Sequence, residues 1–248
     1  MMRLLAIIWM LLAPAQAANV LVTDLSKDQI SIRSNFAGEK LLLFGAIDTA
    51  PYGPVDGVVV VLRGPGEDVL LRKKQKQFGI WINGPATQIG PLPSFYTVVS
   101  SAPLAQLAPQ EERAMLGIGA QTLKGNLISG APSGAPQEEV LAAFRRLKQA
   151  DSLFAAQDDA VEIIDDKLFR AEINLPAGMP VGRYVTEFFA FKAGRLVGYQ
   201  TGELPVDIVG TGHILHQAAY ETPLLYGLSG VAMAIFMGWA VAVIFRRR

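Results

Sequence analysis

The sequence contains no cysteine and only two histidines among its 248 residues. Without a thiol the chain has no disulfide, no thiolate zinc site and no cysteine nucleophile. Neither sign of charge is in excess, because the chain has 22 Lys and Arg and 22 Asp and Glu. A neutral chain lacks the basic field that nucleic-acid binding requires, so we expect no nucleic-acid partner.

Familiar catalytic motifs are also missing. No serine stands in a G-x-S-x-G or S-x-x-K sequence, and no Walker A loop occurs. Gly117 and Gly119 lack the third glycine and the preceding strand of a dinucleotide-binding loop. We therefore expect a protein that is not an enzyme and that carries no cofactor and no metal. A hydrolase with two scattered carboxylates is the alternative, because paired acids have no fixed spacing.

The 51% hydrophobic content is concentrated in two segments, of which the first is residues 1–17. Arg3 makes its start positive, residues 4–12 are an apolar run too short to span a bilayer, and Ala15-Gln16-Ala17 is a small-x-small sequence. This pattern predicts a secretory signal peptide that is cleaved after Ala17, or after Ala18. An uncleaved N-terminal anchor is the alternative.

The second segment, residues 224–245, has no charge and is about 33 Å long as a helix, enough to cross a bilayer. Three arginines, residues 246–248, follow it directly and place that end in the cytoplasm under the positive-inside rule. We therefore predict a single-pass protein of the bacterial inner membrane with its N-terminal domain in the periplasm. Without Arg3 and the three tail arginines, 18 basic residues stand against 22 acidic ones, so the exported body is mildly acidic.

The body, residues 18–210, alternates β-rich runs with turns rich in glycine and proline. Residues 41–44 and 58–62 are continuous apolar runs, as in strands buried on both faces. Tyr184, which follows Gly182 at the start of a late strand, is typical of a tyrosine corner. The pattern predicts a mainly β fold, an immunoglobulin-like β-sandwich. Further strands are predicted over residues 78–83, 94–99, 160–164, 167–174, 182–191 and 195–209.

Residues 103–156 have a different pattern, which predicts helices over 109–116 and 137–154. Acidic residues in the first turn of the second helix and basic residues toward its end suit the helix dipole. We interpret 103–156 as a helical insertion that packs on the sandwich, and a separate helical domain is the alternative. The apolar stripe of the second helix comprises Val140, Leu141, Phe144 and Leu147, and it is expected to extend to Leu153 and Phe154.

Several short sequences between residues 63 and 104 are similar to those of one family. They are Arg63-Gly64-Pro65, Arg72-Lys73-Lys74, Gly79-Ile80-Trp81-Ile82-Asn83, Pro93-Ser94-Phe95-Tyr96 and Pro103-Leu104. With its signal peptide and terminal helix, the chain resembles the putative transmembrane protein family of alphaproteobacteria over nearly its whole length. The resemblance implies an inner-membrane protein with a periplasmic domain, and it implies no activity and no functional residues.

The densest positive patch comprises Arg72, Lys73, Lys74 and Lys76. Such a patch suits anionic lipid headgroups or an acidic partner. Lysines that keep an edge strand from pairing with other strands are the alternative explanation. We expect the neighbouring Trp81 to be a core residue rather than a binding aromatic.

His213 and His216 lie three residues apart just before the predicted span. Imidazoles bind metals and relay protons, but two ligands fall short of a zinc site. We interpret the pair as part of a polar juxtamembrane linker, residues 211–223.

Small residues recur every four positions in the predicted membrane helix, at Gly230, Ala234, Gly238 and Ala242. Close packing of backbones drives helix association in lipid, and small residues allow it. We therefore expect a helix–helix interface with another membrane protein or with a second copy of the chain, within the lipid bilayer.

A cytoplasmic tail of three residues is too short to form a signalling domain. The sequence therefore favours a non-catalytic accessory or binding subunit of a membrane transporter or envelope complex. A membrane-tethered periplasmic domain that binds a solute or polymer is the alternative, and it predicts a pocket near Trp81 and Tyr96. A tethered enzyme is a third hypothesis, which requires two facing acids or a third metal ligand beside the histidines.

Overall fold

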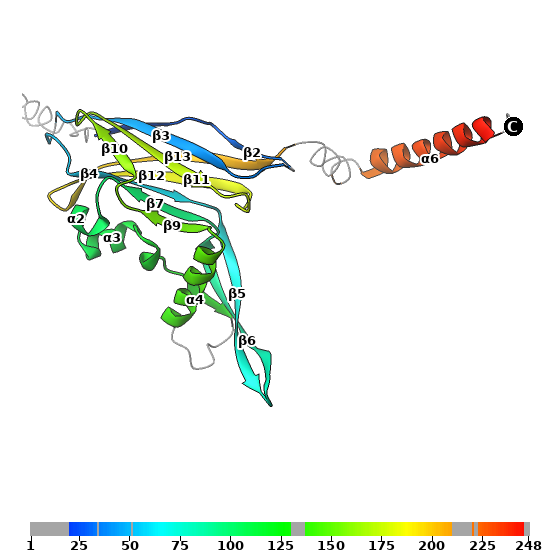
Figure 1. The fold of residues 1–248 in the computed structure, drawn as a ribbon, viewed down its shortest axis with the longest axis horizontal. Coiled ribbons are helices and arrows are strands. Elements are labelled where there is room, and N and C mark those ends of the chain that lie inside the picture. The colour runs from blue at the N-terminus through cyan, green and yellow to red at the C-terminus, as the bar shows by residue number, and fades with distance from the viewer. Residues whose placement is uncertain are drawn as a thin grey trace, which may run out of the picture.

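Residues 20–33, 35–50, 52–129, 137–209, 220 and 223–245 are described by a computed structural model (Figure 1). The predicted signal peptide, the His213 and His216 pair and the arginine tail lie outside the described residues. The strands are β1 Leu21–Leu25, β2 Ile30–Ile32, β3 Glu39–Ile47, β4 Gly57–Arg63, β5 Gly66–Gln77, β6 Ile80–Pro93, β7 Tyr96–Ser100, β8 Asn126–Ser129, β9 Phe154–Gln157, β10 Val161–Ile164, β11 Leu168–Leu175, β12 Gly182–Lys192 and β13 Arg195–Ile208. The helices are α2 Leu104–Leu107, α3 Gln110–Leu116, the short 3₁₀ helix η1 Ala120–Thr122, α4 Gln137–Ala150 and α6 Pro223–Phe245.

The chain is mainly β with several sheets and one C-terminal membrane-helix candidate, which confirms the predicted fold class. One sheet has the order β1-β3-β11-β10, and a larger one has the order β2-β13-β12-β4-β7-β9. The strands of a third sheet, β5-β6-β8, project from these two (Figure 1), although Ile89 and Leu92 at its base belong to the same buried cluster as Val59 and Val61 of the large sheet. The immunoglobulin-like label of the prediction stays a prediction.

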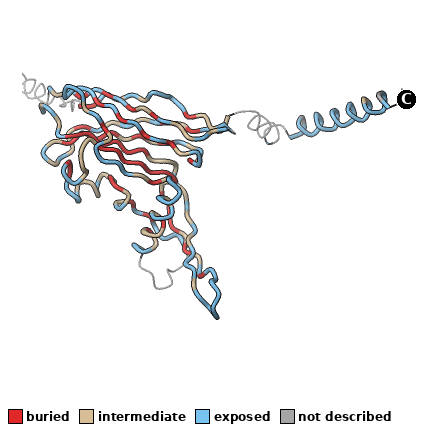
Figure 2. Tube along the Cα trace, viewed as in Figure 1, coloured by how far each residue is buried: buried red, intermediate tan, exposed pale blue. Residues whose placement is uncertain are grey.

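The main core lies between the first two sheets, where Figure 2 shows buried residues along the facing strands. Every second residue of β11 is buried, from Phe169 to Leu175, because successive side chains of a strand point to opposite faces. The ring centroid of Phe169 on β11 lies 5.8 Å from that of Phe188 on β12, and this contact connects the two sheets. Alternation along each strand therefore directs one set of side chains into a shared apolar layer.

Strand β4 is buried on both faces, as its continuous apolar run predicts. Val58 and Val60 belong to the core between the sheets, whereas Val59 and Val61 belong to a second core on the other side of the large sheet. This strand therefore separates two apolar layers.

The second core lies under the helical segment. Leu107, Leu141 and Phe144 pack there with residues of the large sheet, and the ring of Phe144 meets that of Phe154 edge to face at 5.5 Å. The helices therefore cover the outer face of the large sheet.

Helix α4 ends at Ala150, earlier than the expected end at residue 154, because Phe154 begins β9 and pairs with β7.

The hydroxyl of Tyr184 donates a hydrogen bond of 2.7 Å to the carbonyl oxygen of Pro180, four residues upstream. The rest of Tyr184 is buried against Phe95, with the ring centroids 5.6 Å apart. This is the bond that a tyrosine corner makes, and it ties the start of β12 to the loop before it.

Helix α6 is long and apolar enough to cross a membrane, with a mean hydropathy of 1.7 over Tyr226–Val243. None of that window is buried against the rest of the described chain.

Candidate interaction surface

Strands β5 and β6 form a long hairpin, here called the arm, that projects from the body beside α4 (Figure 1). Its base is braced: β8 pairs with β6, Lys73 forms an ion pair of 2.8 Å with Glu139 of α4, and Lys148 of α4 pairs with Glu67 at 2.5 Å. Beyond Lys73 the arm continues for five residues to Phe78, about 17 Å along an extended strand. The far end of the arm is exposed (Figure 2).

The far end, here called the tip, consists of Phe78, Ile80, Trp81 and Ile82. Their exposed fractions are 103%, 66%, 67% and 36%. The turn between the strands has positive φ at both central residues, +49° at Phe78 and +86° at Gly79, which is the geometry of tight hairpin turns. The glycine adopts this conformation freely, whereas the phenylalanine is strained in it. A large apolar side chain therefore occupies the most exposed point of the arm in a conformation that it disfavours.

The expectation that Trp81 is a core residue is wrong. Its strand is apolar enough to be a buried one, but it pairs with β5 beyond the edge of the body, where no second layer of described residues covers it. The alternative hypothesis of a tethered binding domain predicts a pocket near Trp81 and Tyr96. The structure separates these residues, because Trp81 is exposed on the arm whereas Tyr96 is fully buried in the body.

The pairing of the two strands places the tip side chains on two faces. Trp81 lies directly opposite Lys76, so these two side chains share one face of the arm. Ile80 and Ile82 lie opposite Gln77 and Gln75, on the other face. The tip is therefore apolar on both faces.

The basic patch lies on β5, directly behind the tip. Lys73 is held by Glu139, whereas Arg72, Lys74 and Lys76 have no ion pair within the described residues. No acidic residue occurs between Val69 and Pro93. Strand β5 is also an edge of its sheet, so the same lysines discourage pairing with foreign strands.

A groove of about 230 Å³ lies between the arm and α4. Leu71, Val140 and Leu147 line it with apolar surface, and Arg72 and Arg146 add positive charge. Leu147 belongs to the predicted apolar stripe but is 56% exposed, because it faces this groove rather than the core.

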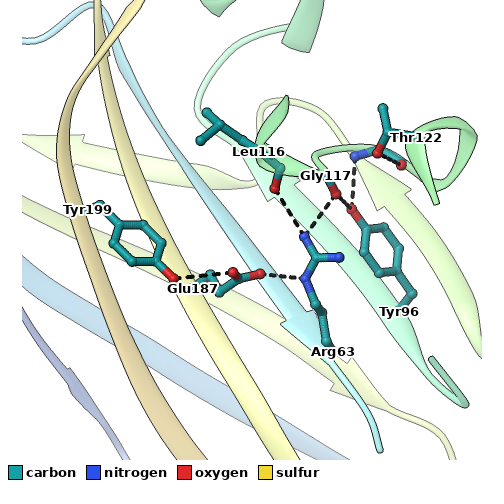
Figure 3. Close-up of polar contacts among 8 residues, drawn as sticks. Arg63, Tyr96, Leu116, Gly117, Thr122, Glu187 and Tyr199 are labelled. Carbon is teal, nitrogen blue, oxygen red and sulfur yellow. Dashed lines mark hydrogen bonds and ion pairs between the residues drawn. The ribbon is translucent and has the colours of Figure 1, made fainter. Parts of the chain in front are cut away.

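The most developed polar cluster in the body surrounds Arg63 at the end of β4 (Figure 3). Its guanidinium pairs with the carboxylate of Glu187 on β12 and donates hydrogen bonds to the carbonyl oxygens of Leu116 (3.3 Å) and Gly117 (2.9 Å). Tyr199 donates a hydrogen bond of 3.3 Å to the same carboxylate. The cluster therefore ties the end of α3 to the large sheet.

Tyr96 completes this tie. Its hydroxyl donates to the carbonyl oxygen of Gly117 at 2.9 Å and accepts from the backbone N–H of Gly119 at 2.8 Å, and the guanidinium of Arg63 lies 5.2 Å from the ring centre. Burial raises the pKa of Tyr96 to about 12, although the nearby charge of Arg63 opposes the shift. Burial and the Glu187 carboxylate likewise raise the pKa of Tyr199. Because the polar groups of the cluster bind one another, we interpret it as a structural tie and not as a reactive site.

The predicted helix–helix interface on α6 stays a prediction. Gly230 and Gly238 lie on α6, and a Cβ added at either would meet no atom within 4 Å in the described chain, so the stripe is unpaired there. In the described ranges no group of three or more histidine, aspartate or glutamate residues is placed to hold a metal.

Sequence reasoning missed the projection of the arm and the pair between Arg63 and Glu187. The available signal for the pair was a single acid in the otherwise apolar and aromatic stretch of β12. A charged residue in a buried part of a strand requires a partner. The sequence does not identify that partner, because the two residues are 124 positions apart in the chain.

The chain was compared with known protein families and with curated proteins. The family described as "Putative transmembrane protein (Alph_Pro_TM)" matches residues 20–247. Among curated proteins, none matches the chain.

Proposed function

Because the chain belongs to the putative transmembrane protein family, we propose that it is a single-pass protein of a bacterial inner membrane. Residues 1–17 act as the cleaved signal peptide, and the immunoglobulin-like β-sandwich stands in the periplasm. The arginines that follow α6 hold the C-terminus in the cytoplasm.

Within that membrane the chain acts as a non-catalytic accessory or binding subunit of a transporter or envelope complex. The distribution of exposed apolar surface carries this proposal. Large apolar side chains are exposed along α6 and at the tip of the arm, whereas the polar cluster around Arg63 is closed on itself. Exposed apolar patches are typical of interaction surfaces, and a catalytic centre needs reactive groups that are open to a substrate.

Affinity purification of the full chain from membranes in mild detergent tests the role of α6. The test variant is Gly230→Leu with Gly238→Leu, and the matched control is Ala232→Leu with Ala240→Leu. Both double variants place leucines eight residues apart, but positions two residues away lie on nearly the opposite face of the helix. We expect a stoichiometric membrane protein to co-purify with the native chain and the control, and to be lost with the test variant.

Loss of the partner with both variants, or with neither, would contradict an interface on the predicted stripe. If no membrane protein co-purifies, the tethered binding domain becomes the better hypothesis. The groove beside α4 supports that alternative, because its apolar floor and two arginines suit an amphipathic anion.

A further inference from the structure

We propose that the tip of the arm inserts into the surface of an anionic lipid bilayer, with the basic patch at the level of the headgroups. The bilayer is always near, because the chain belongs to a transmembrane family. The 13 residues between Val209 and Pro223 hold the body within about 45 Å of the span. The proposal does not depend on a protein partner of α6.

The two-faced apolar surface of the tip favours lipid as its surroundings. A partner protein that binds one face of a hairpin leaves the other face in water, whereas a bilayer surrounds both. Here Trp81 lies on one face, Ile80 and Ile82 lie on the other, and Phe78 caps the end. Tryptophan is also the aromatic side chain that membrane interfaces favour.

The charges fit the depth to which such a tip can enter. Lys76 and Lys74 lie two and four residues behind Phe78, about 7 Å and 14 Å along the strand. Apolar side chains at membrane surfaces reach about 5–10 Å into the boundary between headgroups and acyl chains. The two lysines then lie among the headgroups, and their long stems let the ammonium groups reach phosphate.

The charge of the arm is opposite in sign to that of the body. Four basic residues and no acidic one lie between Val69 and Pro93, whereas the exported body as a whole has an excess of acid. An anionic surface therefore attracts the arm and repels the rest, which orients the tip toward the headgroups. The open backbone edges of a two-stranded hairpin limit it to the interface, because unpaired N–H and C=O groups are excluded from the hydrocarbon.

The absence of native cysteine makes a direct test possible. A single cysteine at Ile80→Cys carries a polarity-sensitive fluorophore, and Val22→Cys on β1 is the matched control, with exposed fractions of 66% and 68% in the native chain. The full chain is reconstituted in vesicles of phosphatidylglycerol and phosphatidylethanolamine, with or without brominated acyl chains. We expect the label at position 80 to shift to the blue and to be quenched by the brominated lipid, and the label at position 22 to do neither.

The variant Lys74→Gln with Lys76→Gln tests the role of charge. Each cation near an anionic surface contributes about fivefold to binding, so the ratio of inserted to free tips should fall about 25-fold. Phosphatidylcholine vesicles should reduce insertion of the native tip in the same way. The melting temperature of the variant should equal that of the parent, because both lysines are exposed.

Equal quenching at positions 80 and 22 in anionic vesicles would overturn the proposal. The same label can be measured in native membranes, where other proteins are present. A label that is shielded there but is unquenched in vesicles that contain no protein except this chain would also overturn the proposal, because another protein would then cover the tip. Insertion that is insensitive to the two lysines would refute the role of the basic patch.

Discussion

At the scale of single residues, buried polar groups in the body act as ties between elements. Arg63 and Glu187 have side chains that are 23% and 17% exposed, so their attraction is less screened than that of an exposed pair. The same arginine bonds the carbonyl oxygens at the end of α3. One ion pair therefore joins two strands and the helical segment.

Tyr96 provides a pH-dependent measure of this tie. Its pKa is about 12 in the folded chain and close to 10 in an unfolded one, so folding favours the protonated phenol. The stabilisation is complete below pH 10 and is lost as the pH rises from 10 to 12. We expect an absorbance titration to show a tyrosine transition near pH 12 that is missing in Tyr96→Phe. A difference titration centred at pH 10 would contradict the burial of the phenol.

At the scale of elements, an amphipathic helix and an apolar strand have different fates in this fold. Helix α4 buries Leu141 and Phe144 against the large sheet, so its periodicity indicates its packing. Strand β6 is equally apolar from Ile80 to Ile82, but among the described residues this part of the strand pairs with β5 alone. The helix is buried because a sheet lies against its apolar face, whereas no such layer of the described chain lies against this part of the strand.

Substitutions on α4 test which part of its stripe is core. Phe144→Ala removes a buried ring that contacts Phe154 and should lower the free energy of unfolding by about 3–5 kcal/mol. Leu147→Ala should lower it by less than about 0.5 kcal/mol, because this side chain lines an open groove. Urea denaturation of the detergent-solubilised chain, followed by circular dichroism, measures both. Equal losses in the two variants would show that the whole stripe is buried.

At the scale of the whole molecule, a mainly β body precedes α6, the candidate membrane helix, and the family matches both over residues 20–247. The proposed accessory role and the proposed lipid contact are tested on different parts of the chain. Substitutions in α6 test the first, and labels and substitutions in the arm test the second. Their tests are therefore independent.

The orientation of the molecule in the membrane can be tested with the same cysteine-free background. A membrane-impermeant maleimide should label Val22→Cys in cells whose outer membrane is permeable, because the body is proposed to stand in the periplasm. It should label Arg248→Cys only after the inner membrane is opened, since the arginines are proposed to lie in the cytoplasm. Labelling of Arg248→Cys with the inner membrane closed would show the opposite orientation.

Local patterns in the sequence determined the membrane-helix candidate, the mainly β class and the position of α4. Each follows from the spacing of apolar residues within about 20 neighbouring positions, so no knowledge of distant contacts is needed. The same reasoning identified Tyr184 as the residue that bonds the preceding loop.

The tertiary structure alone decided which apolar residues are core and which charges are paired. Trp81 is exposed because the layer that covers a strand is supplied by distant parts of the chain, and no such part among the described residues covers the end of the arm. Arg63 finds Glu187 because β4 and β12 are neighbours in the sheet. Periodicity within one segment indicates which face of that segment can be buried. Which distant segment covers that face, and whether any does, depends on contacts between residues far apart in the chain.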